Sequence, residues 1–594
     1  MRKQLSAVVL PLVVLVAFGE TQKASPASQA ALQKVNVVRN ADSIRVELIG
    51  HGQWAAKVMN LDSPSRVVVV LPGTTVATPY NRINVDSRIV KAVRIGSDGR
   101  TPPTASVVID CVDTCRYDLL PAGSDQVILR LSAGNTSTAS VAPMNKAPGG
   151  SASEKSANSK MPTRLSPAMA APSSMAPLYA QKTAAAGMYN GPGGCAASSC
   201  HGSVQPKTTT RIFQNEYTIW IAQDKHARAF AVLSNKVSER IGKILNIGPP
   251  AKAPKCLACH SLFVPVEQRA QTFELADGVS CENCHGPASG WLGPHTTKDW
   301  PHEKSVQLGM YDTRNLEKRS QKCLTCHLGT AEKFVDHEMI AAGHPDLTFE
   351  LGLFTSVMPP HWKMPEQGNP WRQVQAWSVG QAVQLRESLN RLARRASGPV
   401  WPEYAELDCF ACHHSLTRPE DSWRQERGYP GRRPGNPTWN ESRVVVLRDL
   451  IEEINPNSSK QLNDELTQLT TLMNQLNGNR EQISASATRA STFADQLVKQ
   501  VDGQSYDSAL TLRLMRRLAA DGSAISNEGE RSAEQAAMTL DSLFRAYSQN
   551  VKPANANELH ATIDGLFALL QDPSAYSAPH FAAQMQRVSE IVGR

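Results

Sequence analysis

Ten of the twelve cysteines lie in five short segments in which the second cysteine is followed directly by a histidine. Two thiols separated by two residues can form thioether bonds with two vinyl groups on one porphyrin edge, and the adjacent imidazole can then bind the iron. Zinc ribbons and redox dithiols also use cysteine pairs, but they do not need the recurring histidine. The pattern predicts c-type haem attachment, with zinc as the alternative. Four segments have the spacing Cys-x-x-Cys-His, at 256–260, 281–285, 323–327 and 409–413.

The remaining segment has four residues, Ala-Ala-Ser-Ser, between Cys195 and Cys200, and His201 follows. Small residues allow this loop to bulge while the second cysteine and its histidine keep their geometry, so we interpret the segment as a fifth haem site. The alternative is a disulfide or a free thiol pair, which an exported protein permits. The predicted attachment residues are Cys195, Cys200, Cys256, Cys259, Cys281, Cys284, Cys323, Cys326, Cys409 and Cys412, and the predicted proximal ligands are His201, His260, His285, His327 and His413.

Five haems leave five distal axial positions to be filled. Two histidines on one iron give low-spin, saturated haem suited to electron transfer, whereas an open position lets a small molecule bind. The same region holds enough further histidines to close every iron, and methionines are second choices. His414 cannot bind the same iron as its neighbour His413. The distal candidates are His226, His295, His302, His337, His344, His361 and His414.

Several kinds of segment must position these residues. Residues 34–132 alternate apolar and polar side chains between turns, which predicts a small all-β, sandwich-like domain. Residues 133–188 are rich in Ala, Ser and Pro and read as a disordered linker. The haem motifs occupy 189–440, where we expect a mostly α domain with little regular sheet. Residues 441–594 contain no cysteine and have helical periodicity, which predicts a C-terminal helical bundle.

The N-terminus reads as a secretory signal within residues 1–30. Arg2 and Lys3 precede a short apolar run from Leu5 to Phe18, too short for a comfortable membrane-spanning helix. An uncleaved anchor is the alternative. The chain has no other long apolar segment, so we expect an exported protein of the periplasm or cell envelope. Its net charge of +8 includes no basic run with interleaved aromatic residues, so we expect no nucleic-acid partner.

Cys111 and Cys115 are the two cysteines outside the motifs, and no histidine follows Cys115. A local disulfide requires their Cα atoms to lie within about 7 Å. The alternative is two buried free thiols.

The motif region resembles the multihaem cytochromes c related to the tetrahaem electron carrier of bacterial ammonia oxidation. This resemblance implies periplasmic electron transfer, a mostly helical scaffold, and His226, His295, His337, His344 and His361 as distal ligands. The tetrahaem carrier has four haems, one of them five-coordinate, whereas this chain has five motifs. The segments that carry the resemblance include KHARAF, KCLACHS, GVSCENCHGPASGWLGPH, CLTCHLG, DHEMIAAGHPDLTFEL, MPPHW, LDCFACHHSL and SWRQERGYPGRRPG.

Residues 34–132 resemble the AMIN domain of envelope proteins, through SRVVVVLPG, VRIGSDG, VVID and YDLLPAGSDQVILRL. This resemblance implies attachment to peptidoglycan or to an envelope complex, with a simple spacer as the alternative.

Two functions follow as hypotheses. The first is a periplasmic electron-transfer protein with five covalent haems c, tethered by its β domain and served by redox proteins or quinol-linked donors of the envelope. The second is an oxidoreductase acting on hydroxylamine, nitrite or nitric oxide at one open haem. Enough histidines are present to close every iron, so we expect the first and not an enzyme. A weaker third idea is a scaffold whose C-terminal helices dock a larger complex.

Overall fold

The computed structural model describes residues 30–594 apart from 134–186, 364–367, 414–438 and several gaps of one to five residues at 41, 63–64, 81, 86, 98–102, 124, 410–411 and 476–477. The predicted signal segment up to residue 29 and nearly all of the predicted linker lie outside the described residues. Within the described residues, no helix combines the length and the apolar character needed to cross a bilayer.

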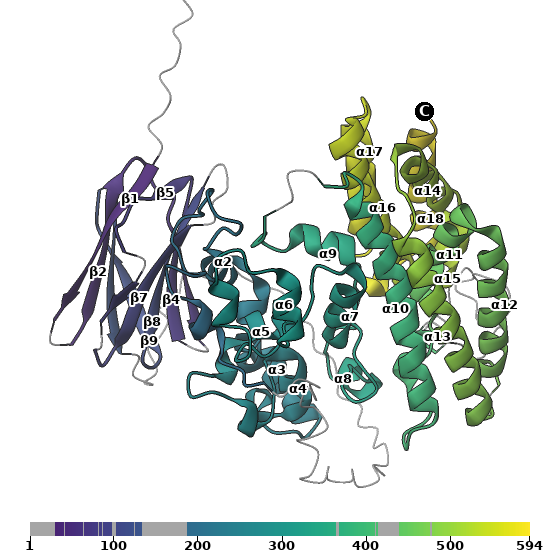
Figure 1. The fold of residues 1–594 in the computed structure, drawn as a ribbon, viewed down its shortest axis with the longest axis horizontal. Helices are drawn as coiled ribbons and strands as arrows, with labels where there is room; N and C mark the ends of the chain where they lie inside the picture. The colour runs from purple at the N-terminus through teal and green to yellow at the C-terminus, as the bar shows by residue number, and fades with distance from the viewer. Residues whose placement is uncertain are drawn as a thin grey trace, which may run out of the picture.

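The N-terminal part is a sandwich of two five-stranded sheets, as the alternation predicted (Figure 1). One sheet has the strand order β5-β1-β2-β10-β9 and the other β3-β4-β8-β7-β6. Alternate residues of β4, such as Val67, Val69 and Leu71, are fully buried between the sheets. The strands are β1 Ala30–Arg39, β2 Ile44–His51, β3 Lys57–Asp62, β4 Ser65–Pro72, β5 Thr74–Val76, β6 Arg82–Asn84, β7 Val90–Ser97, β8 Thr104–Cys111, β9 Cys115–Leu120 and β10 Gln126–Ala133.

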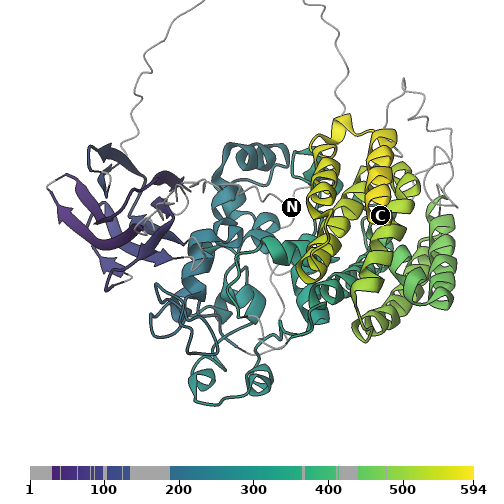
Figure 2. The ribbon, with the colours of Figure 1, turned by 90° about the horizontal axis from the view of Figure 1, so that it is seen from above.

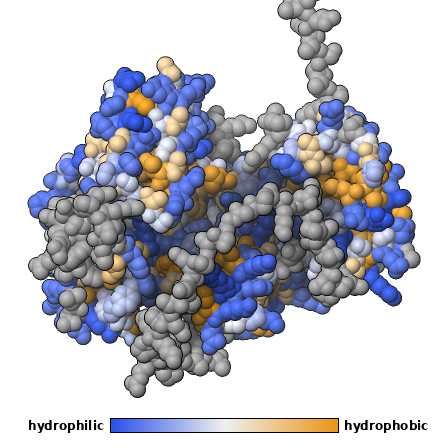
Figure 3. Space-filling view, turned by 180° about the vertical axis from the view of Figure 1, so that it is seen from behind, coloured by the Kyte–Doolittle hydropathy of each residue, from blue (hydrophilic) through white to orange (hydrophobic). Residues whose placement is uncertain are grey.

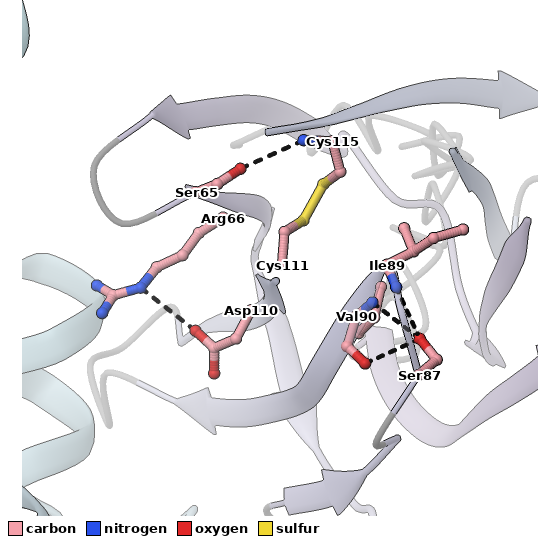
Figure 4. The surroundings of a disulfide bond; sticks show 8 residues. All are labelled: Ser65, Arg66, Ser87, Ile89, Val90, Asp110, Cys111 and Cys115. Atoms are coloured by element: carbon pink, nitrogen blue, oxygen red, sulfur yellow. Dashed lines mark hydrogen bonds and ion pairs between the residues drawn. A yellow bond between two sulfur atoms is a disulfide. The ribbon is translucent and has the colours of Figure 1, made fainter. Parts of the chain in front are cut away.

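A disulfide joins Cys111 at the end of β8 to Cys115 at the start of β9 (Figure 4). Their Cα atoms are 6.2 Å apart, within the range that a disulfide can bridge. This finding decides between the two alternatives left by the sequence: the pair is a disulfide that links the two sheets at this corner.

The motif region lies between the β domain and the C-terminal helices (Figures 1 and 2). Short helices connected by loops make up this region, because Pro and Gly recur between the motifs. The α-helices are α2 Glu216–Gln223, α3 Lys236–Ile244, α4 Pro254–His260, α5 Cys281–His285, α6 His302–Gln307, α7 Leu316–His327, α8 His337–Ala341 and α9 Leu351–Val357. The short 3-10 helices are η1 Pro192–Cys195, η2 Lys225–Arg228, η3 Ala231–Ser234, η4 Pro250–Lys252, η5 Val266–Gln268, η6 Leu275–Asp277, η7 Pro294–Thr296 and η8 Tyr404–Glu406.

Long helices form the other end of the molecule, and one hydrophobic core runs through them from Leu316 to Val592. The long helix α10 Arg372–Ala396, which precedes residue 440, packs along α13 in this core. Packing is therefore continuous across the predicted boundary at residue 440. The remaining elements are η11 Glu441–Arg443, α11 Val445–Ile454, α12 Pro456–Met473, α13 Arg480–Asp502, α14 Ser508–Ala520, α15 Gly522–Glu528, α16 Glu530–Val551, α17 Ala556–Ala568, η12 Pro573–Ala575 and α18 Ala578–Gly593.

Trp377 on α10 tests this shared core. Its side chain is 1% exposed, and its indole N–H donates to Thr539 Oγ1 on α16 at 3.1 Å. We expect Trp377→Ala to lower the free energy of unfolding by about 3–5 kcal/mol, because it leaves a large cavity. Trp377→Phe, which keeps a ring, should cost less. Guanidinium titration followed by far-UV circular dichroism measures both. A loss below about 1 kcal/mol for Trp377→Ala would contradict the shared core.

The β domain rests directly on the motif region. Arg94 on β7 binds both carboxylate oxygens of Asp110 at 2.6 and 2.7 Å and donates to the Tyr217 hydroxyl of α2 at 3.1 Å. Arg66 pairs with the same carboxylate at 3.3 Å (Figure 4). Bidentate guanidinium–carboxylate pairs hold a defined geometry. The two parts are therefore packed together by a partly buried charged network.

Candidate haem-binding site

Three of the Cys-x-x-Cys-His motifs end short helices, and a helical turn explains their geometry. The motifs close α4, form α5 and end α7. In a helix the histidine amide donates to the carbonyl of the first cysteine, which brings both thiols and the imidazole to one side. The motif at 409–413 makes the same closure, because the His413 amide donates to the Cys409 carbonyl at 2.7 Å.

The longer motif at 195–201 reaches the same closure through its bulged loop. The His201 amide donates to the Cys195 carbonyl at 3.2 Å, although His201 is six positions after Cys195 instead of four. The Cys200 amide donates to Ala197 and so folds the extra residues back. Gly202 makes this possible, because a Cβ there would lie 1.9 Å from the Ala196 carbonyl oxygen. The backbone thus presents Cys200 and His201 as the shorter motifs present theirs.

Four of the predicted proximal histidines each face one predicted distal histidine. The ring centres are 6.2 Å apart for His201–His295, His226–His327 and His337–His413, and 6.3 Å apart for His260–His344. An imidazole nitrogen binds a transition metal at about 2.0 Å and lies about 1.1 Å from its ring centre, so two rings on opposite sides of one iron have centres about 6.2 Å apart. These side chains therefore fit a haem iron between each pair.

The remaining motif histidine, His285 of the third motif, has no such ring partner among the described residues. His361 is nevertheless close enough for its charge to act on His285. Burial, together with the charges of His361, His201 and His302, lowers the pKa of His285 to about 4. A histidine with this pKa is neutral at pH 7, as an iron ligand must be.

Most of the paired histidines are held by a hydrogen bond from Nδ1, which directs Nε2 toward the partner ring. His201 Nδ1 binds Glu216 Oε2 at 2.9 Å, and His226 Nδ1 binds Asp224 Oδ1 at 2.9 Å. These hydrogen bonds raise the pKa values of both histidines. Backbone carbonyls accept from His260, His295, His344 and His361 at 2.9, 2.6, 2.7 and 3.1 Å.

His302 has the opposite arrangement. Its Nε2, the atom that an iron would need, is bound to Asp312 Oδ1 at 3.0 Å. Because its Nε2 is already occupied, His302 is less suited to bind iron than distal candidates that are held through Nδ1. His414, also a candidate from the sequence, lies outside the described residues.

The sites form a connected set whose order in space differs from the order in sequence. The Cys195 side chain lies close to that of Cys281, and the Cys259 side chain lies close to that of Cys326. The first motif therefore adjoins the third, and the second adjoins the fourth. Burial and the charge of Cys284 raise the pKa of Cys323, so the third motif also lies near the fourth.

The fifth motif joins the set through residues just before His337. The side chain of Asp336 pairs with Lys255, the residue before Cys256. Glu403 on the loop before Cys409 accepts from the His337 amide at 3.0 Å. Seen from behind, the surface is hollowed in the middle of the molecule, between the β domain and the C-terminal helices (Figure 3).

Sequence reasoning missed the groups that orient the histidines. Glu216 and Asp224 are the two carboxylates, and Asp224 lies two residues before His226, a spacing that could have pointed to it. The helix α8 begins at His337 and ends at Ala341, so His344 lies beyond it, and the two histidines face different proximal histidines.

Two family models match the chain. The model "Cytochrome c554 and c-prime" matches residues 195–286, and the model "AMIN domain" matches residues 34–128. The first match begins at Cys195 and contains the first three motifs, and its family implies covalently bound c-type haem. The second covers most of the β sandwich and is associated with the cell envelope. No curated protein and no solved structure matches the chain. The two matches support a cytochrome c with an N-terminal AMIN domain.

Proposed function

We propose that this chain is a periplasmic electron-transfer protein that holds five haems c, each bound by two histidines. When bound, haem supplies one-electron redox chemistry at its iron. The observation that carries the proposal is the separation of 6.2–6.3 Å between four facing imidazole pairs. The proposed assignments pair His201 with His295, His260 with His344, His327 with His226, and His413 with His337.

For the third motif we propose His361 as the partner of His285. Its Nδ1 donates to the Pro359 carbonyl, so its Nε2 is free to bind iron. The proximity of His361 to His285 supports this assignment. The residues of the chain thereby fix the imidazole orientations, exclude small molecules from the axial positions and keep the five sites adjacent.

The AMIN domain supports a place for the protein at the cell envelope. We propose that it attaches the haem-bearing part to peptidoglycan or to an envelope complex, with redox proteins or quinol-linked donors as electron partners. The contact between Arg94 and Tyr217 means that the β domain also holds the haem-bearing part by a direct contact.

A second candidate function, an oxidoreductase for a small nitrogen compound, rests on one observation. His285 is the motif histidine without a facing ring among the described residues, so the third haem is the one that could expose an open position.

Spectroscopy of the reduced holoprotein with carbon monoxide distinguishes the two functions. If every iron has two histidines, we expect low-spin signals alone and no carbon monoxide adduct. One adduct per chain, together with a high-spin signal, would support the oxidoreductase and contradict the proposed electron carrier with five closed irons.

A further inference from the structure

One exposed face of α3 combines apolar and basic side chains. Val237 and Ile244, seven residues apart, are 61% and 54% exposed, and Lys236, Arg240 and Lys243 lie on the same side of the helix. The opposite side, formed by Ile241 and Gly242, is buried. Val232, 41% exposed, lies beside the start of the helix, where its carbonyl accepts from the Ser238 hydroxyl. The α3 face is defined here as Val232, Lys236, Val237, Arg240, Lys243 and Ile244.

The cations of the α3 face have no carboxylate partner at ion-pair distance in the described part of the chain. Lys252 on the adjacent η4 is also exposed and without an ion pair there. Glu239 is the acidic residue that α3 itself contributes. On other helices of the described chain some exposed cations are paired, as Lys460 is with Asp464 on α12 and Lys499 with Asp495 on α13. The α3 face therefore presents uncompensated positive charge around a small apolar area.

The buried side of α3, opposite the α3 face, packs next to the second haem motif. A Cβ on Gly242 would lie 2.6 Å from the Gly248 carbonyl oxygen and 3.0 Å from Pro250, so α3 packs tightly on the turn that leads into α4 (Figure 1). Cys256 itself belongs to the small core that joins this turn to Leu233 and Leu257. His260 donates from Nδ1 to the Ala229 carbonyl in the segment that precedes α3.

From this geometry we propose that the α3 face is the docking site of an acidic electron-transfer protein that exchanges electrons with the haem of Cys256 and Cys259. The inference rests on the proposed function. Interfaces of transient redox complexes are small, and complementary charge at their edges speeds encounter. A membrane of anionic lipid carries the same negative charge as an acidic protein. The buried side of α3, however, packs on the turn that leads into a haem motif, and this favours a redox protein, whose cofactor must come close to the haem.

The test uses the full holoprotein and reduced flavodoxin, a small acidic electron carrier, as the probe. Stopped-flow absorbance follows haem reduction by the wild type, Arg240→Glu and Arg587→Glu. Arg587 is an exposed arginine on α18, away from the α3 face, so its reversal is the matched control. At low ionic strength we expect Arg240→Glu to slow reduction about tenfold and Arg587→Glu to leave it nearly unchanged. At high ionic strength the difference should shrink, because salt screens the charges.

Equal rates for the two variants would overturn the docking site. So would an Arg240→Glu protein that loses binding to phosphatidylglycerol vesicles while flavodoxin still reduces it at the wild-type rate. Dithionite reduces haem without a docking protein, so its use distinguishes a failure of the docking site from a failure of the proposed electron-transfer function. Full reduction of five haems by dithionite with no effect of Arg240→Glu on the flavodoxin rate would reject the docking site alone. Incomplete reduction by dithionite would count against the proposed function.

Discussion

Replacing His295 by alanine is expected to convert one of the five proposed haems from low-spin to high-spin iron. His295 faces His201 at 6.2 Å with nearly parallel rings, and its Nδ1 is fixed by the Leu292 carbonyl. Removing the imidazole opens the distal position of the first haem, while Cys195, Cys200 and His201 still attach it. The reduced variant should therefore bind one carbon monoxide per chain where the wild type binds none. Electron paramagnetic resonance and carbon monoxide difference spectra measure this change.

His302→Ala is the matched control for this experiment. It also removes one histidine from the same stretch of the chain, but His302 uses Nε2 to bind Asp312. Its spectrum should be indistinguishable from that of the wild type. If His302→Ala gained a carbon monoxide site and His295→Ala did not, the assignment of the first haem would be wrong.

Glu406→Gln is expected to destabilise the protein by about 3–5 kcal/mol, because it leaves buried Arg391 without its anion and Arg395 with only the more distant Glu403 carboxylate at 3.6 Å. The Glu406 side chain is 3% exposed and pairs with Arg391 at 2.7 Å and with Arg395 at 3.2 Å, both on α10. These pairs hold η8, and hence the segment that leads to Cys409, against the helical core. We also expect the haem of Cys409 and Cys412 to lose its low-spin signal first as denaturant is added.

Glu332→Gln is the control for Glu406→Gln, because it also removes the anionic partner of an arginine on α10. Its partner Arg394 also lies on α10, but the pair is 3.3 Å long and about half exposed on both sides. An exposed pair contributes at most about 1 kcal/mol, so this variant should unfold close to the wild-type midpoint. Guanidinium titrations of the two variants should thus differ clearly. Equal midpoints would show that Glu406 is not the anchor of η8.

The sequence predicted elements whose signal is local. Alternation along strands such as β4 predicted the β sandwich, and the spacing of Cys and His predicted the candidate haem sites. The bulged motif at 195–201 could be proposed from its small residues, but its closure depends on a hydrogen bond from His201 to Cys195 that only the fold shows.

The features that sequence reasoning did not reach depend on contacts between distant segments. The pairing of His260 with His344 brings together residues 84 positions apart, and no local pattern specifies it. The core shared by α10 and α13 extends across residue 440, where the cysteine content alone had suggested a boundary. Spacing also could not identify Glu216 as the partner of His201, and it could not decide between a disulfide and free thiols at Cys111 and Cys115.

The number of covalently attached haems tests the central claim most directly. Intact mass spectrometry of the mature protein, combined with pyridine haemochrome quantitation, gives this number. The account predicts five haems per chain, and Cys200→Ser should reduce the number to four. Four haems in the wild type, with no change in Cys200→Ser, would contradict haem attachment at residues 195–201. Cys195 and Cys200 would then form a disulfide or a pair of free thiols.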